Sequence, residues 1–403
     1  MNVAALIFLS FAFAYFLSAL VRAVTATLAP AFSAELGLNA GDLGLLAGAY
    51  FLGFAATQLP LGHALDRWGP RRVLLAFLGV AVAGCVAFAM AGHFAALTLA
   101  RALIGAGLSA CLMAPLTAFR RSFTPVAQLR ANSWMLMSGS LGMVASTLPV
   151  QWLLPWLGWR GLFWLVAALL VVAIAGIRLC VPADDAGTTP WSRPGGYAAI
   201  ARHPVFVRYA PLAFFHYGGM VAIQTLWAGP WLVRVCGWTP QQAAGGLFSI
   251  NVAMLLAFFA WGVVVPRLYR AGWSASRLVG WGVPISLAVL GGVIALGEGA
   301  AAPAWAMFCV SCTVISLSQP AVGQAFSPAL AGRALSAYNL VIFSGIFALQ
   351  WGLGLAIDAL SAAGWSTVSA FQGSMALLLL CSLGAYLWFL WHGRWVDAPP
   401  PAT

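Results

Sequence analysis

The chain has 403 residues, of which 63% are hydrophobic and only 7% are charged, and its formal net charge is +11 at pH 7. A soluble globular domain carries about 25% charged residues, so this composition excludes an ordinary soluble protein and indicates a polytopic membrane protein. All 19 basic residues are arginines, and most lie in short gaps between apolar runs, which is typical of membrane topology rather than of nucleic-acid binding.

Apolar runs of about 20 residues, each ended by charged residues, glycine or proline, predict twelve transmembrane helices. The first run has no basic segment before it and is longer than the apolar core of a signal peptide, so we expect it to remain as a span. The predicted helices cover residues 5–31, 42–63, 71–92, 94–118, 131–154, 159–181, 208–233, 242–265, 275–297, 302–324, 334–357 and 366–391.

The arginines between these runs are distributed unequally. With both termini in the cytoplasm, fifteen arginines fall in cytoplasmic segments and only Arg160 and Arg234 fall in outer loops. Short cytoplasmic loops collect basic residues, so the sequence predicts this orientation. The absence of lysine is typical of a GC-rich bacterial gene, and we therefore expect a multi-pass protein of a bacterial inner membrane.

The longest interruption, at 181–208, contains two aspartates, four prolines and three arginines. We interpret residues 182–207 as a cytoplasmic linker between a six-helix bundle at 1–181 and a second one at 208–403. Two such bundles predict an internal repeat, and an offset of 200 residues aligns similar helix ends. The aligned pairs are Thr25 with Thr225, Pro30 with Pro230, Gly37 with Gly237, Gly62 with Gly262 and Arg67 with Arg267.

The gap between the second and third predicted helices holds the densest cluster of charges, in the sequence LGHALDRWGPRRVL at 61–74. A generic cytoplasmic loop would carry basic charge, but it would not require this spacing of glycine and aspartate. The spacing resembles the loop signature of the major facilitator superfamily. The matching positions are Gly62, Asp66, Arg67, Gly69, Arg71 and Arg72.

This resemblance, which extends over residues 5–391, implies an all-α polytopic fold with twelve transmembrane helices in two pseudo-symmetric six-helix bundles. It also implies secondary transport by alternating access, in which the two bundles rock about a central cavity. In that mechanism the loop has a gating role. Asp66 would hold arginines and helix N-termini of the opposite bundle, while Arg67, Arg71 and Arg72 would lie at the anionic leaflet.

Two arginines lie inside predicted spans, Arg22 in the first and Arg101 in the fourth. An arginine at such depth costs about 2.5–3.5 kcal/mol on insertion scales. All 8 acidic residues lie in loops or at helix ends, so no carboxylate is available at that depth. A guanidinium that faces a cavity without such a partner can bind a carboxylate or phosphate through two parallel hydrogen bonds. We therefore predict that both arginines contact an anionic substrate.

The resemblance separates the two arginines. Arg101, which precedes a glycine-rich stretch, resembles the fourth-helix signature of the superfamily, where an arginine serves coupling or structure. Arg22 resembles the first-helix arginine of the organophosphate and anion:cation symporter branches, although Val21 and Leu108 stand where the anion symporters have acids. The structural alternatives are an interhelical hydrogen-bonding role for Arg101 and, for Arg22, a side chain that reaches the outer interface.

Other polar side chains inside the predicted spans extend the predicted substrate site. Tyr15 and Thr25 share a face of the first helix with Arg22. The seventh helix, its repeat partner, and three later helices supply further candidates. An interhelical hydrogen bond is the alternative role for each of them. These further candidates are His216, Gln224, Trp227, Asn251, Gln319 and Asn339.

We predict a secondary transporter of a small organic anion, coupled to a proton or to a counter-anion. A proton-coupled multidrug or metabolite exporter is the alternative, although the fifth helix, SGSLGMVASTLPV, lacks the glycine-proline pattern of drug antiporters. A non-transporting membrane sensor is a remote alternative. The sequence contains no nucleotide-binding lysine and no catalytic or metal-ligand pattern, so we expect no enzyme activity, cofactor or metal. We expect a monomer in the lipid bilayer, without a nucleic-acid partner.

Overall fold

The computed structural model describes residues 3–183 and 196–396, and every regular element in those ranges is helical. Asp184, Asp185 and Arg193 of the predicted linker lie outside these ranges. The first eight helices are α1 (Val3–Leu36), α2 (Ala40–Ala56), α3 (Gln58–Trp68), α4 (Pro70–Met90), α5 (Phe94–Leu108), α6 (Ala110–Ser122), α7 (Pro125–Ala145) and α8 (Leu148–Cys180).

The second part of the chain has more interruptions, and there η denotes a short π-helical or 3-10 turn. Its elements are α9 (Tyr197–Arg202), α10 (Pro204–Pro211), η1 (Leu212–Tyr217), α11 (Gly218–Ala222), η2 (Ile223–Trp227), α12 (Ala228–Arg234), α13 (Pro240–Arg270), α14 (Ala275–Leu296), η3 (Gly297–Gly299), α15 (Ala302–Cys312), η4 (Thr313–Leu317), α16 (Ser318–Gln324), α17 (Pro328–Ala362) and α18 (Thr367–Val396).

Nine helical stretches in the described ranges are long and apolar enough to cross a membrane, or ten when α2 and α3, bent by 41°, count as one span. The other two predicted spans, 131–154 and 208–233, are also mostly helical, but each is interrupted. The fifth is broken between α7 and α8, and the seventh contains both π-helical turns. The prediction of an all-α polytopic membrane protein is confirmed.

The break in the fifth span has a local cause. Ser146 and Thr147 donate their hydroxyl groups to the carbonyls of Met143 and Val144, at 2.7 and 2.6 Å. Such bonds compete with the helical backbone ladder, and Pro149 then lacks an N–H to continue that ladder. The helix therefore restarts as α8, and a second interruption at Gly158, with φ of 62°, separates the end of the fifth span from the sixth.

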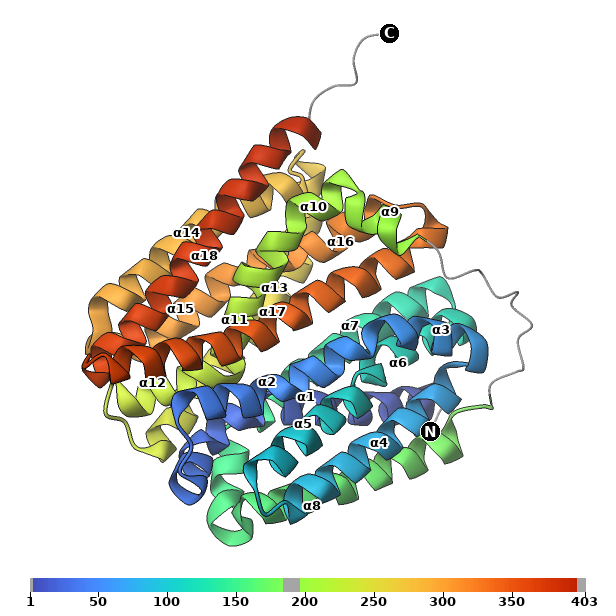
Figure 1. Cartoon of the computed structure of the whole chain (residues 1–403). Helices are drawn as coiled ribbons and strands as arrows, with labels where there is room; N and C mark the ends of the chain where they lie inside the picture. Colours follow the sequence, from blue (N-terminus) through green and yellow to red (C-terminus); the bar gives the residue numbers. More distant parts are fainter. Residues whose placement is uncertain (1–2, 184–195, 397–403) are drawn as a thin grey trace.

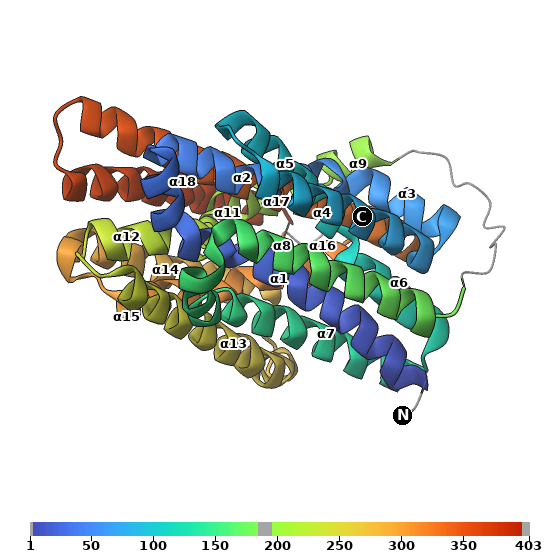
Figure 2. The ribbon, with the colours of Figure 1, turned by 90° about the horizontal axis from the view of Figure 1, so that it is seen from below.

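Figure 1 shows two groups of helices, with α1–α8 in the lower right and α10–α18 in the upper left. The helices α2 and α17 lie next to each other where the groups meet. Seen from below in Figure 2, the long helices run side by side in a common direction, as membrane-crossing helices do. The division at 182–207 remains a prediction, because residues 184–195 of that segment lie outside the described residues.

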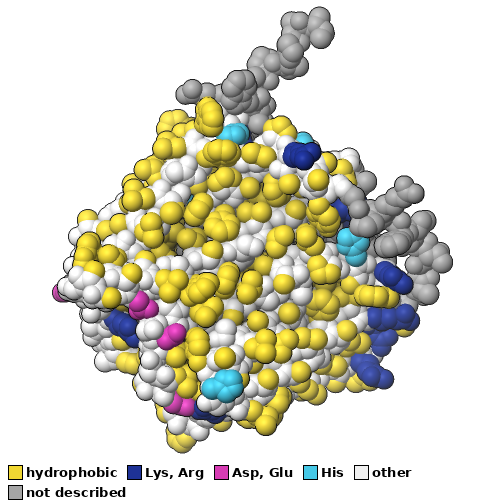
Figure 3. Space-filling model, in the orientation of Figure 1, with side chains coloured by type: hydrophobic (Ala, Val, Ile, Leu, Met, Phe, Trp, Pro, Cys, Tyr) yellow, Lys and Arg dark blue, Asp and Glu magenta, His cyan; other side chains and the backbone are white. Residues whose placement is uncertain are grey.

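The surface of the protein is largely apolar. Figure 3 shows hydrophobic side chains over most of one face, with most of the arginines towards the right and top and the acidic groups at the lower left. Trp156, Leu179 and Trp281 expose 86%, 84% and 73% of their surface. Large apolar side chains exposed to this extent would be unfavourable in water but fit the hydrocarbon of a bilayer.

The two ends of the bundle differ in charge. The Arg-rich end is the end where α3 meets α4 and α8 terminates, and it carries Arg67, Arg71 and Arg178. The Arg-poor end is the opposite one, where α1 terminates and α2 begins. Arg71 donates from Nη2 to the backbone carbonyl of Arg178 at 2.7 Å, which joins the loop after α3 to the last turn of α8.

Glycines allow α2 and α17 to pack backbone against backbone. A Cβ atom added at Gly44 of α2 would overlap the carbonyl of Gln350 on α17, and one added at Gly354 of α17 would overlap the carbonyl of Ala40. Small residues at a helix interface permit such close approach in membranes. The interface between the two groups of helices is therefore tightest near the Arg-poor end of α2.

Candidate functional site

Arg22 lies near the middle of α1, and its side chain is partly accessible although aromatic residues surround it. Its guanidinium carbon is 5.5 Å from the centre of the Phe54 ring, and the phenols of Tyr15 and Tyr50 interact with the same charge. Its Nε atom is buried without a hydrogen-bond partner in the described structure. The protein thus holds a cation at depth and leaves part of its hydrogen-bonding capacity unused.

The surroundings of Arg22 come from both groups of helices. Phe54 belongs to α2, and its ring centre is 4.2 Å from that of Phe343 on α17. Tyr217, at the end of η1, also interacts with Arg22. Ligand sites of two-bundle transporters lie at the junction of the repeats near mid-membrane. The structure places Arg22 at such a junction.

No carboxylate neutralises Arg22 in the described structure. The ion pair found among the described residues joins Glu35 to Arg160 at the Arg-poor end. Trp159 also donates a hydrogen bond to Glu35, at 2.6 Å. Asp358 accepts hydrogen bonds from the backbone at the start of α2. Among the described side chains, the acids that make these contacts therefore lie at the Arg-poor end and not beside Arg22.

Arg101 has a different environment, because it is only 1% exposed and has partners within the protein. Its Nη2 donates to the carbonyl of Val21 at 2.9 Å and to the hydroxyl of Thr25 at 2.5 Å. Its guanidinium also lies 5.2 Å from the centre of the Tyr50 ring. These contacts tie α5 to α1 directly beside Arg22, and they favour the structural alternative for Arg101, although they do not test its contact with substrate.

The predicted polar face of α1 is present. Tyr15 packs so closely against α7 that a Cβ atom on Gly139 would overlap its ring, and Thr25 is the residue bound by Arg101. Tyr50 donates weakly to the carbonyl of Ser18 at 3.5 Å. This side of α1 therefore contacts other protein segments through polar groups, with Arg22 at its centre.

The candidates on the seventh and eighth predicted spans are hydrogen-bonded within the protein. Gln224 donates to Asn251 at 3.0 Å, and Asn251 donates to the carbonyl of Leu247 at 2.9 Å. The indole of Trp227 donates to the carbonyl of Gln350 at 3.2 Å. All three candidates are buried, so these bonds favour the interhelical role over direct contact with a ligand.

His216 and the pair on the tenth and eleventh spans are also engaged. The Nε2 atom of His216 lies 2.8 Å from the hydroxyl of Ser286, in a buried position. Gln319 donates to Asn339 at 2.9 Å, and both side chains remain partly accessible. The structure therefore brings Arg22, Tyr15 and Thr25 together and leaves the other neutral candidates in separate hydrogen-bonded pairs.

The predicted gating loop forms the junction of α3 and α4. Gly69 adopts φ of 81°, in the left-handed region, and Pro70 then starts α4 at the position where a missing N–H costs least. Arg67 lies over the ring of Trp68 at 5.5 Å. A Cβ atom on Gly62 would meet only the Ser336 hydroxyl of α17, at 3.9 Å.

The side chain of Asp66 lies outside the described part of the structure, so its gating role stays a prediction. The roles predicted for Arg71 and Arg72 at an anionic leaflet likewise remain untested.

Sequence reasoning missed the aromatic part of the site. Phe54, Tyr217 and Phe343 lie in apolar runs and resemble ordinary core residues. Only the structure shows that Phe54 and Tyr217 interact with Arg22 and that Phe343 packs against Phe54. Within residues 3–183 and 196–396, no three His, Cys, Asp or Glu side chains gather closely enough to hold a metal ion.

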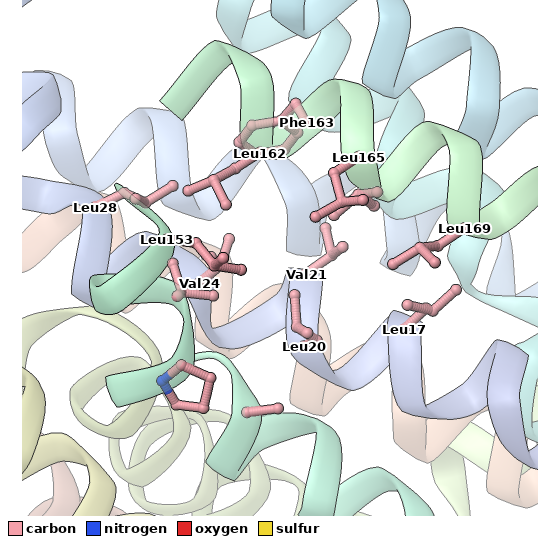
Figure 4. A pocket seen from close by; sticks show the side chains of 14 residues that line it. Leu17, Leu20, Val21, Val24, Leu28, Leu153, Leu162, Phe163, Leu165 and Leu169 are labelled. Carbon is pink, nitrogen blue, oxygen red and sulfur yellow. The ribbon is translucent and has the colours of Figure 1, made fainter. Parts of the chain in front are cut away.

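A separate apolar groove of about 140 Å³ lies between α1, α7 and α8 (Figure 4). Leu17, Val21 and Val24 line it from the side of α1 opposite to Arg22, and Leu153 and Leu165 of α8 are 41% and 38% exposed at its margin. A groove without polar groups on the lipid-facing surface offers nothing to hold a charged solute. It is therefore distinct from the surroundings of Arg22.

Comparison with known families gives a match to the family model described as Major Facilitator Superfamily over residues 11–350. A chloramphenicol resistance protein of Streptomyces lividans is 31% identical over 162 residues, which cover 40% of this chain and 41% of that protein. A voltage-gated purine nucleotide uniporter of Homo sapiens is 22% identical over 280 residues, covering 62% of this chain and 58% of the relative. The chain therefore spans about half the length of these relatives.

Solved structures with the same fold cover nearly the whole chain. A bacterial homologue of the human lysosomal transporter Spinster aligns over 100% of both chains with a TM-score of 0.77 and 18% identity. A D-xylose-proton symporter aligns over 94% of this chain and 97% of its own, with a TM-score of 0.71 and 12% identity. At these identities the likeness establishes the fold.

Proposed function

The chain belongs to the major facilitator superfamily, and from this premise we propose that it is a secondary transporter that moves a small organic anion across the membrane by alternating access. The observation that carries the proposal is the guanidinium of Arg22. It lies where the two groups of helices meet, and it has an unpartnered Nε and no carboxylate among the described side chains. A charge held in this way at depth is expected to have a function.

The chemistry around Arg22 indicates how an anion would be held. The guanidinium offers a planar fork to a carboxylate or phosphate, and the phenols of Tyr15, Tyr50 and Tyr217 can donate to the same oxygens. Phe54 provides an apolar wall that strengthens each electrostatic contact by excluding water. The relative that transports purine nucleotides, which are anions, also supports this substrate class.

The experiment is a binding titration on purified protein, first screened for thermal stabilisation by benzoate, citrate, ADP and chloramphenicol. Arg22→Ala should weaken binding of the stabilising anion about tenfold or more, because charge-assisted hydrogen bonds contribute about 1.5–3 kcal/mol. Arg22→Lys should also be impaired, because an ammonium group cannot reproduce the two-bond fork. Arg234→Ala, which removes an exposed arginine at the Arg-poor end, is the control.

Equal affinities in wild type, Arg22→Lys and Arg22→Ala would contradict the proposal. A side chain that only reaches the membrane interface would tolerate lysine fully. Its removal would lower the melting temperature and leave affinity unchanged.

A proton-coupled drug exporter is the second candidate, supported by the similarity to the chloramphenicol resistance protein. That similarity covers only 40% of the chain. The aromatic residues around Arg22 would also accept a neutral aromatic compound. Stabilisation by chloramphenicol that is independent of Arg22, with no response to the three anions, would favour this candidate.

We further propose a bacterial inner membrane as the location, with both termini in the cytoplasm, and a monomer as the transporting unit. The distribution of arginines between the two ends supports this orientation. A proton or a counter-anion would supply the driving force. The scarcity of intramembrane carboxylates favours the counter-anion, since protons are usually relayed by Asp, Glu or His.

A further inference from the structure

We propose that Asp358 of α17 is the latch that keeps the Arg-poor end of the transporter closed, by holding the first turn of α2. The carboxylate accepts hydrogen bonds from the backbone N–H groups of Ala40 at 3.0 Å and Gly41 at 2.6 Å. These bonds connect the two groups of helices across their interface. The inference rests on the alternating-access mechanism proposed above, but not on the identity of the substrate.

The backbone N–H donors at the start of α2 explain why this contact matters. A helix leaves its first N–H groups without intrahelical partners. Here the Asn39 side chain accepts from Asp42 N at 2.7 Å, and the Asp42 side chain accepts from Asn39 N at 3.3 Å. This capping box satisfies two donors within the helix. The remaining two, on Ala40 and Gly41, are satisfied only by the carboxylate of Asp358.

The electrostatics of the two helices favour the same contact. Asp358 lies near the C-terminal end of α17, where the helix dipole is negative and disfavours an acidic side chain. The N-terminal end of α2 is positive and faces it. The carboxylate therefore interacts unfavourably with the dipole of α17 and favourably with the dipole of α2. The favourable interaction exists only while the two helices are together.

Glycine makes the approach of the carboxylate possible. A Cβ atom on Gly41 would lie 2.9 Å from the Oδ2 atom of Asp358 and 3.1 Å from a methyl carbon of Leu355. The neighbouring contact is closer still, since a Cβ atom on Gly44 would overlap the carbonyl oxygen of Gln350. On the other flank, Gly229 of α12 packs against the backbone of Ala26 in α1. The Arg-poor end is thus closed by backbone packing, and the charged contact of Asp358 lies at its edge.

Opening this end would separate the two helices. The N–H groups of Ala40 and Gly41 would then bond to water, as would the carboxylate. Because the Asp358 side chain is already partly exposed and water would replace each bond, the exchange has a modest cost, which suits a latch that must open in each transport cycle. A hydrogen bond to a charged group stabilises a structure more than a neutral hydrogen bond does. The difference in free energy corresponds to about a tenfold change in an equilibrium constant.

The test measures distances between spin labels in protein without added substrate. One pair of labels, at Ala34 and Ser361, spans the Arg-poor end, and a second, at Thr124 and Ala271, spans the Arg-rich end; all four positions are exposed. The partly exposed cysteines Cys180, Cys236 and Cys381 are first replaced. Asp358→Asn should raise the ratio of open to closed Arg-poor ends about tenfold.

Gly41→Ala should shift the same ratio in the same direction while it keeps the charge, because the added methyl displaces the carboxylate. Asp42→Asn weakens the cap within α2, and Glu298→Gln removes an exposed carboxylate at the same end, so neither should change the distances. Unchanged distances in Asp358→Asn would overturn the proposal, even if its melting temperature fell. An equal shift in Glu298→Gln would also overturn it. No anion is added, so failure of the anion proposal would leave this result unaffected.

Discussion

Thr25 and Thr225 occupy equivalent positions 200 residues apart, and each accepts a hydrogen bond from a polar side chain of another helix. Arg101 donates to Thr25 at 2.5 Å, and Gln350 donates to Thr225 at 2.9 Å. The two threonines that the predicted 200-residue offset pairs thus make similar contacts, but the donors come from the fourth and the eleventh spans, which that offset does not pair, and they differ in charge. In the first part of the chain the donor is charged, and in the second part it is neutral.

This difference predicts unequal losses of stability. Arg101→Met should lower the free energy of unfolding by about 3 kcal/mol, because two bonds from a charged donor are lost, whereas Gln350→Met should lower it by about 1 kcal/mol. Melting curves of the two variants measure the difference. If Arg101→Met instead lost affinity for the stabilising anion without losing stability, Arg101 would contact the substrate directly.

The packing of α2 against α17 gives a second prediction. Gly44→Ala would place a methyl group on the carbonyl of Gln350, so it should lower stability by about 1–3 kcal/mol. Gly352→Ala, on the same α17, meets nothing within 4 Å and should be neutral or stabilise by up to about 1 kcal/mol. Thermal unfolding of both proteins compares them. A loss of similar size in both variants would show that the loss at Gly44 is not specific to this interface.

The orientation of the chain can be checked by labelling. Single cysteines at positions 67 and 267 should react with a membrane-impermeant reagent only from the cytoplasmic side, and a cysteine at position 234 only from outside, because the arginines sort in that way. Inside-out and right-side-out vesicles provide the two sides. Reaction of position 67 or 267 from outside would contradict the predicted topology.

The gating role predicted for Asp66 and the latch proposed at Asp358 make a joint prediction. Asp66→Asn should weaken closure of the Arg-rich end and cut transport, while substrate binding stays nearly unchanged, since Asp66 is predicted to hold a helix N-terminus of the opposite bundle. The spin-label distances should therefore shift opposite to those of Asp358→Asn, and the double variant should lie between the two. A shift in the same direction for both single variants would contradict the gating role of Asp66.

The sequence predicted the helical class and the positions of most spans, because apolar runs and charged gaps follow directly from the thickness of a bilayer. The family was predicted separately, from the resemblance of the loop at 61–74 to a family signature. Their similar apolar contexts gave Arg22 and Arg101 the same predicted contact with an anion, and only the family resemblance separated the two. In the structure, what separates them is the carbonyl of Val21 and the hydroxyl of Thr25, which lie 80 and 76 residues away from Arg101 in the chain.

In the sequence, Asp358 is one of several acids in loops or at helix ends, because the contacts that distinguish it are distant in the chain. Its partners are backbone N–H groups more than 300 residues away, and these carry no side-chain signal. The break at Ser146 was missed because serine and threonine occur in continuous membrane helices as well as at breaks.

The groove in Figure 4 gives α1 two different environments. The side chain of Val21 lines the groove, its carbonyl accepts a hydrogen bond from Arg101, and the next residue is Arg22. A lipid tail or detergent molecule that fills the groove would therefore contact the segment of α1 that carries Arg22, the residue proposed to bind the anion. The occupant of the groove then becomes part of the binding equilibrium, and we expect the affinity for the anion to differ between micelles and bilayers.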